Sequence, residues 1–232
     1  MLRYALGVAL AGVSSLALAA CGQSGAHISG DSHGPMKAVS RLDCPDAQGS
    51  LSRKAAAADG RSCDYAGPDG AVVALTLADM TGKDADAVLD PLGRDLRAEL
   101  PKAPPTPATP DRPKDKENEK VDIDLPGVHI HANGDHATVD AGPADGGKNG
   151  VRVNANDNGA EVHVDDRSGS GVRKLMVLTA DKPGPHGYSV AAYDARGPAS
   201  GPLVVAAVRA KDHDHDALMH DVGELVRRNV GG

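Results

Sequence analysis

The strongest constraint on the fold is a pattern that occurs twice, 23 residues apart, in the C-terminal half of the chain. Residues 128–140 and 151–163 each alternate apolar and polar side chains, pass through a turn of Asn, Gly and Asp residues, and alternate again. Alternation with a period of two is typical of a strand with one buried and one solvated face, and the turn residues favour a hairpin. The pattern therefore predicts two antiparallel β-hairpins.

The alternation also assigns the two faces of these hairpins. We expect the apolar positions to face a core, and they are Val128, Ile130, Val139, Val151, Val153, Val162 and Val164. We expect the polar positions to face solvent, and they include His129, His131, Arg152, Asn154 and His163. The stretch 123–140 resembles the rungs of putative-adhesin-type bacterial β-solenoids, which implies a β-rich module and assigns no role to any residue.

Three more strands and a helix complete this second module, which we place at residues 121–232. The strands are predicted at 172–180, 188–193 and 203–209, between loops that contain Pro and Gly. The helix is predicted over residues 216–230, where apolar residues recur at helical spacing. Asp214 and Asp216 are both suitable caps for its first turn, and Arg227 and Arg228 suit its last turn.

The N-terminus predicts export and a lipid anchor. One basic residue, Arg3, precedes an apolar stretch at residues 5–19, which is short for a membrane span. The stretch ends in Leu18-Ala19-Ala20-Cys21, which resembles the lipobox of bacterial lipoproteins. The resemblance implies a signal peptide at residues 1–20, cleavage before Cys21 and attachment of acyl chains to that cysteine. Two or three buried chains hold a protein on a membrane essentially permanently.

The residue after the cysteine bears on the membrane to which the protein is attached. In the lipoprotein family an Asp at that position commonly retains the protein at the inner membrane, and here it is Gly22. The resemblance thus favours the outer membrane, on its periplasmic side or at the cell surface. The periplasmic face of the inner membrane is the alternative. Residues 21–35 form a flexible tether in this interpretation.

A first module is predicted at residues 36–100. Strands at 51–57, 61–65 and 71–77 surround the turn dipeptide Asp59-Gly60, and apolar residues at helical spacing predict a helix over 84–100, with a kink or restart at Pro91. In an exported protein the remaining cysteines, Cys44 and Cys63, are most simply a disulfide. Their spacing does not match a C-x-x-C redox motif or a zinc ribbon.

Composition divides the two modules. Residues 101–120 are rich in Pro and then almost wholly charged, so they predict a disordered linker that cannot bury a core. The chain has no Phe and no Trp, and its apolar residues are largely Ala and Val, which favours two small units over one thick core. The expected fold class is α+β and mostly β: a small disulfide-stapled meander with a helix, a linker, and a hairpin-repeat module with a C-terminal helix.

Charge and aromatic content narrow the classes of partner. The formal net charge is −7 and no basic cluster is present, which argues against a nucleic-acid partner. Only three tyrosines lie outside the signal peptide, so few rings are available to stack on sugars or bases.

Histidines are the best candidates for a bound metal. His213, His215 and His220 lie close together in the sequence, among aspartates, and predict a Zn²⁺ or Cu²⁺ site. His129 and His131 on one strand face, joined by His163 from another strand, are an alternative set. An Asp-His alternation is also a favourable lead-in to a helix.

The sequence matches calcium-binding and catalytic motifs only in part or not at all. Asn154-x-Asn156-x-Asn158-Gly159 with Asp165 partly matches a calcium loop, but it has strands on both sides and Glu161 at an apolar position. No nucleophile elbow, phosphate loop or zinc-protease signature is present. We therefore expect a lipoprotein that is not an enzyme and has an envelope structural or protein-interaction role. The alternative is a periplasmic lipoprotein that binds or senses a transition metal.

Overall fold

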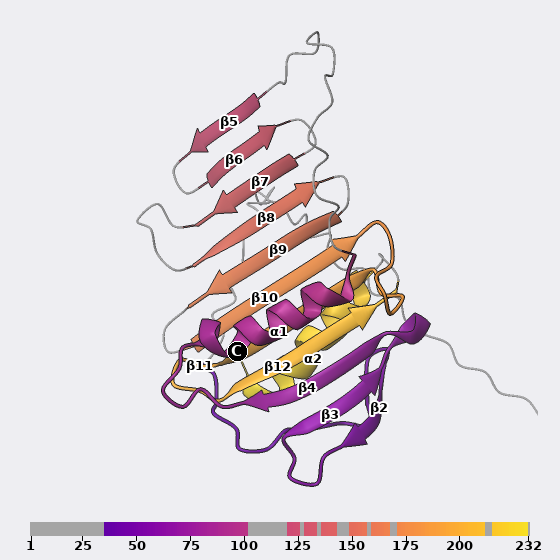
Figure 1. Ribbon diagram of the computed structural model, residues 1–232. Helices are drawn as coiled ribbons and strands as arrows, with labels where there is room; N and C mark the ends of the chain where they lie inside the picture. Colours follow the sequence, from indigo (N-terminus) through magenta and orange to yellow (C-terminus); the bar gives the residue numbers. More distant parts are fainter. Residues whose placement is uncertain are drawn as a thin grey trace, which may run out of the picture. The chain divides into compact units, whose positions relative to one another are not determined.

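The computed structural model describes residues 35–101, 120–125, 128–133, 136–142, 149–156, 159–167, 171–211 and 215–231. In these ranges twelve strands form one antiparallel sheet, in the order β1-β2-β3-β4-β12-β11-β10-β9-β8-β7-β6-β5 (Figure 1). The two described α-helices are α1 (Ala85–Glu99) and α2 (Asp216–Val230). The strands are β1 (Ala47–Gln48), β2 (Leu51–Ala56), β3 (Ser62–Ala66), β4 (Val72–Ala78), β5 (Lys120–Leu125), β6 (Val128–Asn133), β7 (His136–Ala141), β8 (Gly150–Asn156), β9 (Gly159–Asp166), β10 (Gly171–Ala180), β11 (Val190–Pro198) and β12 (Leu203–Ala210).

A mostly antiparallel β fold with two helices is therefore confirmed, and the N-terminal elements form close to their predicted bounds. The predicted helix begins after Asp84, whose Oδ1 accepts a hydrogen bond from the backbone N–H of Ala87 at 2.8 Å. The expected restart at Pro91 does not occur, because α1 continues through it to Glu99. Leu89 and Leu96, on either side of the proline, are both buried, so packing holds the helix together where a backbone hydrogen bond is lost.

The structure differs from the expected division into modules 36–100 and 121–232, because one sheet crosses the boundary between them. β4 pairs with β12, from Val72 opposite Arg209 to Ala78 opposite Leu203. The physical reason is that β4 alone would end the first meander in an open edge with unpaired backbone groups. The apolar strand β12 covers that edge. The predicted linker lies outside the described residues for nearly its whole length.

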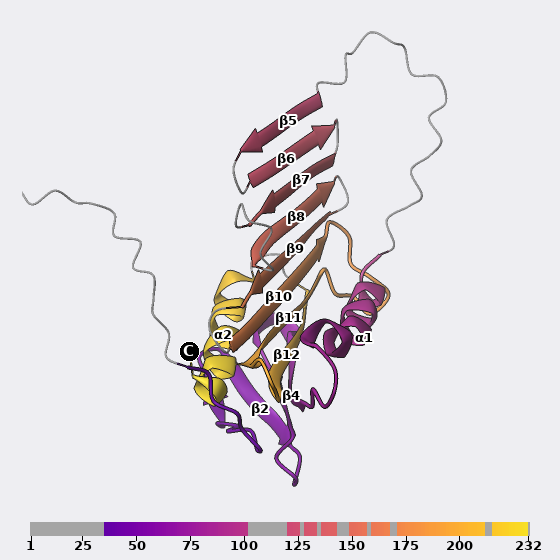
Figure 2. The ribbon, with the colours of Figure 1, turned by 90° about the vertical axis from the view of Figure 1, so that its left-hand side faces the viewer.

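The two helices cover opposite faces of the sheet (Figure 2). Residues of β11 and β12 alternate between the faces, so both strands are buried on both sides. Under α2 lie Leu51, Tyr65, Val73, Leu75, Val204 and Val208, which pack with Leu218, Val222, Leu225 and Val226 of the helix. Under α1 lie Met176, Leu178, Tyr193, Leu203 and Val205, which pack with Leu89 and Leu96. Because β11 and β12 consist largely of Ala and Val, both helices can approach the sheet closely.

The hairpins of the repeat extend the sheet beyond the helices. β6 pairs with β7, and β8 pairs with β9. The helix α1 contacts β10 and β11, whereas α2 contacts β11, β12 and β1. The alternation predicts that Val151 faces a core, but 38% of it is exposed, so that expectation is wrong. Val139, Val153, Val162 and Val164 are half-buried. The side chains of Val128 and Ile130 lie outside the described part of the structure.

The shared sheet predicts cooperative unfolding of its N-terminal and C-terminal strands. Val208 is 0% exposed and lies opposite Val73. We expect Val208→Ala to cost about 2–3 kcal/mol through lost burial and a residual cavity. Hydrogen exchange measured by mass spectrometry should show the same loss of protection in β3–β4 and in β11–β12.

The matched control is Val72→Ala, at the next register position of the same ladder. Because Val72 is 38% exposed, this change should alter stability by less than about 0.5 kcal/mol. A loss of protection confined to β11 and β12 in the Val208 variant would contradict a single cooperative sheet.

Candidate functional site

The predicted lipid attachment site, Cys21, and most of its tether lie outside the described residues. Within the described ranges, no helix is long and apolar enough to cross a membrane. The lipid anchor therefore stays a prediction from the sequence.

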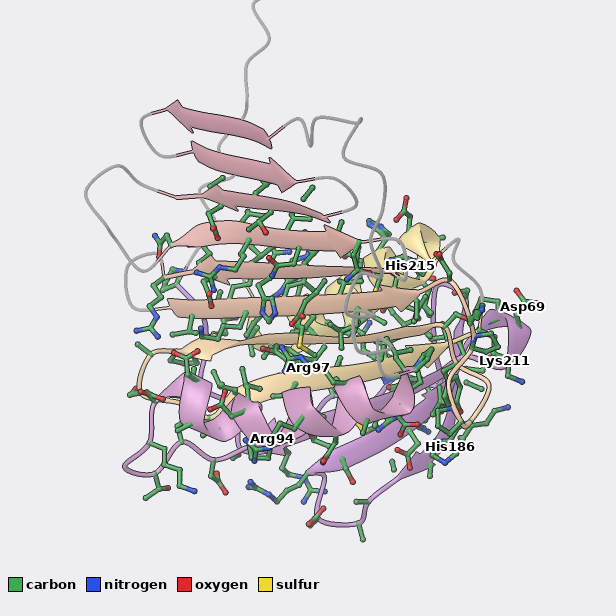
Figure 3. The ribbon with its side chains drawn as sticks, turned by 45° about the horizontal axis from the view of Figure 1, so that its top comes forward. Asp69, Arg94, Arg97, His186, Lys211 and His215 are labelled. Carbon is green, nitrogen blue, oxygen red and sulfur yellow. A yellow bond between two sulfur atoms is a disulfide. The ribbon has the colours of Figure 1, made fainter. Side chains whose placement is uncertain are left out.

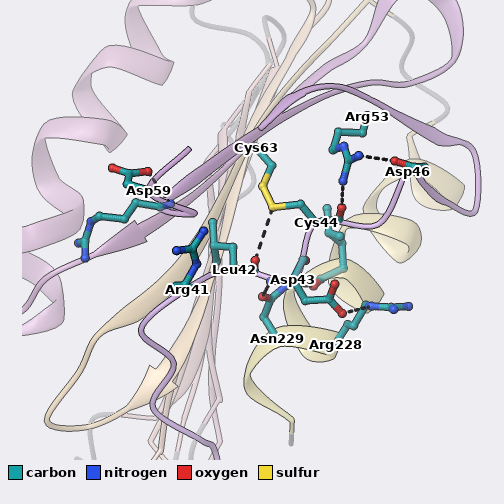
Figure 4. The surroundings of a disulfide bond; sticks show 12 residues. Arg41, Leu42, Asp43, Cys44, Asp46, Arg53, Asp59, Cys63, Arg228 and Asn229 are labelled. Atoms are coloured by element: carbon teal, nitrogen blue, oxygen red, sulfur yellow. Dashed lines mark hydrogen bonds and ion pairs between the residues drawn. A yellow bond between two sulfur atoms is a disulfide. The ribbon is translucent and has the colours of Figure 1, made fainter. Parts of the chain in front are cut away.

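The predicted disulfide between Cys44 and Cys63 is confirmed (Figure 4). It joins the segment before β1 to the buried start of β3, with the two Cα atoms 6.3 Å apart. A loop of 19 residues closed in this way contributes about 3 kcal/mol in the chain-entropy model. The same segment is also attached to α2, because Arg228 Nε lies 2.6 Å from Asp43 Oδ2. The backbone N–H of Asp43 donates to Asn229 Oδ1 at 2.7 Å.

The predicted C-terminal metal set is only partly described. His213 lies outside the described residues, His215 precedes the first turn of α2, and His220 is exposed on that helix (Figure 3 labels His215). Residues five positions apart on a helix are not neighbours on one face. Among the side chains that the structure describes, no group of three His, Cys, Asp or Glu residues is arranged to hold a metal ion. A site that includes His213 stays a prediction.

The alternative histidine set cannot form as expected. The register runs from His129 to Asp140, Arg152 and then His163, so the two histidines are three strands apart. At the usual strand spacing this separation is about 14 Å, which is too far for ligands of one ion. His163 is instead engaged locally, with Nε2 2.5 Å from Glu161 Oε1.

A network of ion pairs, which the sequence analysis missed, connects α1 to β9 and β10. Arg97 of α1 pairs with Glu161 of β9 (Figure 3 labels Arg97). Lys174 of β10 pairs with Asp165 of β9, and its Nζ lies 2.5 Å from Oδ1 of Asp86 on α1. The alternating acidic residues of β9 are visible in the sequence, but their partners lie far away along the chain. Only strand register and helix placement bring them together.

The environment of this network fixes the charges of its members. Burial favours the neutral form of Lys174, but its hydrogen bonds to Asp165 and Asp86 raise its pKa above the ordinary value. Burial likewise favours protonation of Glu161, yet hydrogen bonds from His163 and Arg97 hold its pKa below the usual range. Burial, with the nearby charges of Asp165 and Asp86, raises the pKa of Tyr193 to about 12. At neutral pH Lys174 is therefore a cation and Glu161 an anion, so both can form ion pairs between α1 and the sheet.

The other face of β7–β9 carries a continuous set of apolar side chains, which we call the valine face: Val139, Val151, Val153, Val162 and Val164. One row of the ladder runs from Val139 through Val153 and Val162 to Val177. Val177 packs against the core under α2, so the valine face continues that side of the sheet. The helix α2 lies over β11 and β12 and leaves these valines partly exposed.

Comparisons with known proteins identify no relative of this chain. The sequence matches no known protein family, and neither the search of curated proteins nor the search of solved structures found a match.

The Glu161 network predicts a pH-dependent contribution to stability. A carboxyl group whose pKa is lower in the folded state stabilises the fold above its unfolded pKa of about 4.3, and this stabilisation is lost as the pH falls through the folded pKa. We expect Glu161→Gln to be less stable than the wild type by about 1 kcal/mol at pH 7. The difference should shrink as the pH is lowered from about 4.3, as measured by urea unfolding at several pH values.

The control is Glu224→Gln, which removes a surface ion pair with Arg227 within α2. Such a pair contributes less than about 0.5 kcal/mol. Equal stability of Glu161→Gln and the wild type at pH 7, or a difference that does not change between pH 7 and pH 3, would contradict the role given to Glu161.

Proposed function

We propose that this protein is a lipid-anchored component of a bacterial envelope that acts without catalysis, by binding another envelope protein. The lipobox-like residues that end in Cys21 support the anchor and favour the outer membrane, on its periplasmic side or at the cell surface. The disulfide between Cys44 and Cys63 supports an oxidising compartment, where such bonds form and persist.

The observation that carries the binding role is the valine face. The strands β7–β9 are apolar on one side and polar on the other, which is the pattern of a strand that packs on something. In the described residues the main contacts of α1 and α2 with the sheet are made with β10, β11, β12 and β1. Contiguous exposed apolar surface is typical of protein interaction sites, and each Å² that it loses on binding contributes about 25 cal/mol.

The opposite face of the same strands is polar, so only the valine face offers apolar contact surface. Asp140 and Arg152 form an ion pair there, with Arg152 Nε 2.7 Å from Asp140 Oδ1. Glu161 on this side is held by Arg97 of α1. A protein partner is therefore expected on the valine face, and its contact surface must itself be apolar. The competing hypothesis, a metal-binding or metal-sensing lipoprotein that uses His213, His215 and His220, rests on the sequence alone.

The anchor is tested by replacing its cysteine. In a bacterium that processes lipoproteins, we expect Cys21→Ser to abolish both the incorporation of labelled palmitate and the recovery in the membrane fraction of the mature protein that begins at residue 21. The double variant Cys44→Ser/Cys63→Ser is the control, since it should retain label and membrane association. Labelled, membrane-bound Cys21→Ser protein would contradict the proposed anchor.

The binding role is tested by site-specific crosslinking from two neighbouring positions on opposite faces of β8. A photo-crosslinking amino acid at position 151 should give a discrete adduct in intact cells, and the same group at position 152 should not. Val153→Glu should remove the adduct formed from position 151, because it places a charge in the apolar contact. Failure to form an adduct at position 151, or equal adducts from both positions, would overturn the proposal.

A further inference from the structure

The hairpin of β5 and β6 places two aspartates directly opposite two histidines. Asp122 is the register partner of His131, and Asp124 is the register partner of His129. All four positions belong to the polar rows of the ladder, because the intervening pair, Ile123 and Ile130, belongs to the row of Val139 and Val153. The four residues thus occupy one face of one hairpin, on the side opposite to the valine face.

The spacing of these positions is that of a compact ligand set. Directly opposed residues of antiparallel strands have Cβ atoms about 4.5–5.5 Å apart. Residues two apart along a strand are separated by about 6.8 Å. The four register positions therefore mark the corners of a rectangle of about 5 Å by 7 Å, which is the scale of a site for a single metal ion.

The residues on the neighbouring strand limit the set to this hairpin. Asp140, the partner of His129 on β7, is already paired with Arg152 at 2.7 Å. Thr138, the partner of His131, donates from Oγ1 to Asn154 Oδ1 at 3.2 Å. In the described sheet β5 is the edge strand, so no further strand pairs with it.

We propose that the juxtaposition of Asp122 and Asp124 with His129 and His131 on the β5–β6 hairpin forms a binding site for one divalent transition-metal ion. Histidine and aspartate are residue types that bind Zn²⁺ and Cu²⁺, and the register brings two of each to one face of the hairpin. The site is distinct from the C-terminal set of His213, His215 and His220. It goes beyond the proposed binding role, because it uses the other face of the sheet.

The test is calorimetric titration of the full-length protein in detergent with Zn²⁺. We expect one equivalent to bind to the wild type, and His129→Ala/His131→Ala to weaken this binding at least tenfold. The matched control is His213→Ala/His215→Ala/His220→Ala, which should retain wild-type affinity. Asp122→Asn/Asp124→Asn keeps both imidazoles and should also weaken binding, while circular dichroism verifies that each variant is folded.

A second measurement identifies the ligands and does not depend on affinity. The electron paramagnetic resonance spectrum of the protein with one equivalent of Cu²⁺ should show hyperfine coupling to two imidazole nitrogens, and to one in His129→Ala. The proposal is overturned by wild-type affinity in the His129/His131 variant, by loss of binding in the C-terminal triple variant, or by the absence of Zn²⁺ uptake. None of these outcomes bears on the crosslinking expected from the valine face.

Discussion

The ladder between β4 and β12 is the contact on which the rest of this structure depends, because it joins strands from the two ends of the chain. It covers the edge of the meander β1–β4 and gives β12 a partner on each side. The strands β11 and β12 are then buried on both faces, and each face needs a cover. The helix α2 covers one face of β11 and β12, the two strands that come just before it in the sequence, and α1 covers the other face from a distant part of the chain.

The same arrangement explains why the hairpins of the repeat remain open. Each helix spans only 15 residues and lies over the middle of the sheet. Beyond it the strands continue with the same alternation, apolar on the side of α2 and polar on the side of α1. The apolar side becomes the valine face, to which we assign partner binding. The polar side near α1 is occupied by the ion pairs of Glu161 and Lys174, and farther out it carries the proposed metal ligands of the β5–β6 hairpin.

Much of the local structure could be predicted because its causes are local. Asp59-Gly60 favours a tight turn, Asp84 is a good helix cap, and the alternation of residues 128–140 favours a hairpin with two unlike faces. The pairing of Cys44 with Cys63 followed from the small number of cysteines and the expected export. The continuity of α1 through Pro91 was missed, because the cost of a proline is local whereas the compensating burial of Leu89 and Leu96 is tertiary.

The sequence by itself predicted most of the strands, both helices and the alternating faces of the repeat hairpins, because each depends on residues close together along the chain. The lipid anchor at Cys21 stays a prediction from the lipobox-like residues. Only the tertiary structure decided that the N-terminal and C-terminal segments share one sheet, and that His163 is bound to Glu161 rather than to a site with His129. The physical reason is that strand pairing joins backbones irrespective of their separation in sequence. The position of each side chain relative to distant ones is therefore set by strand order and register, which no local pattern specifies.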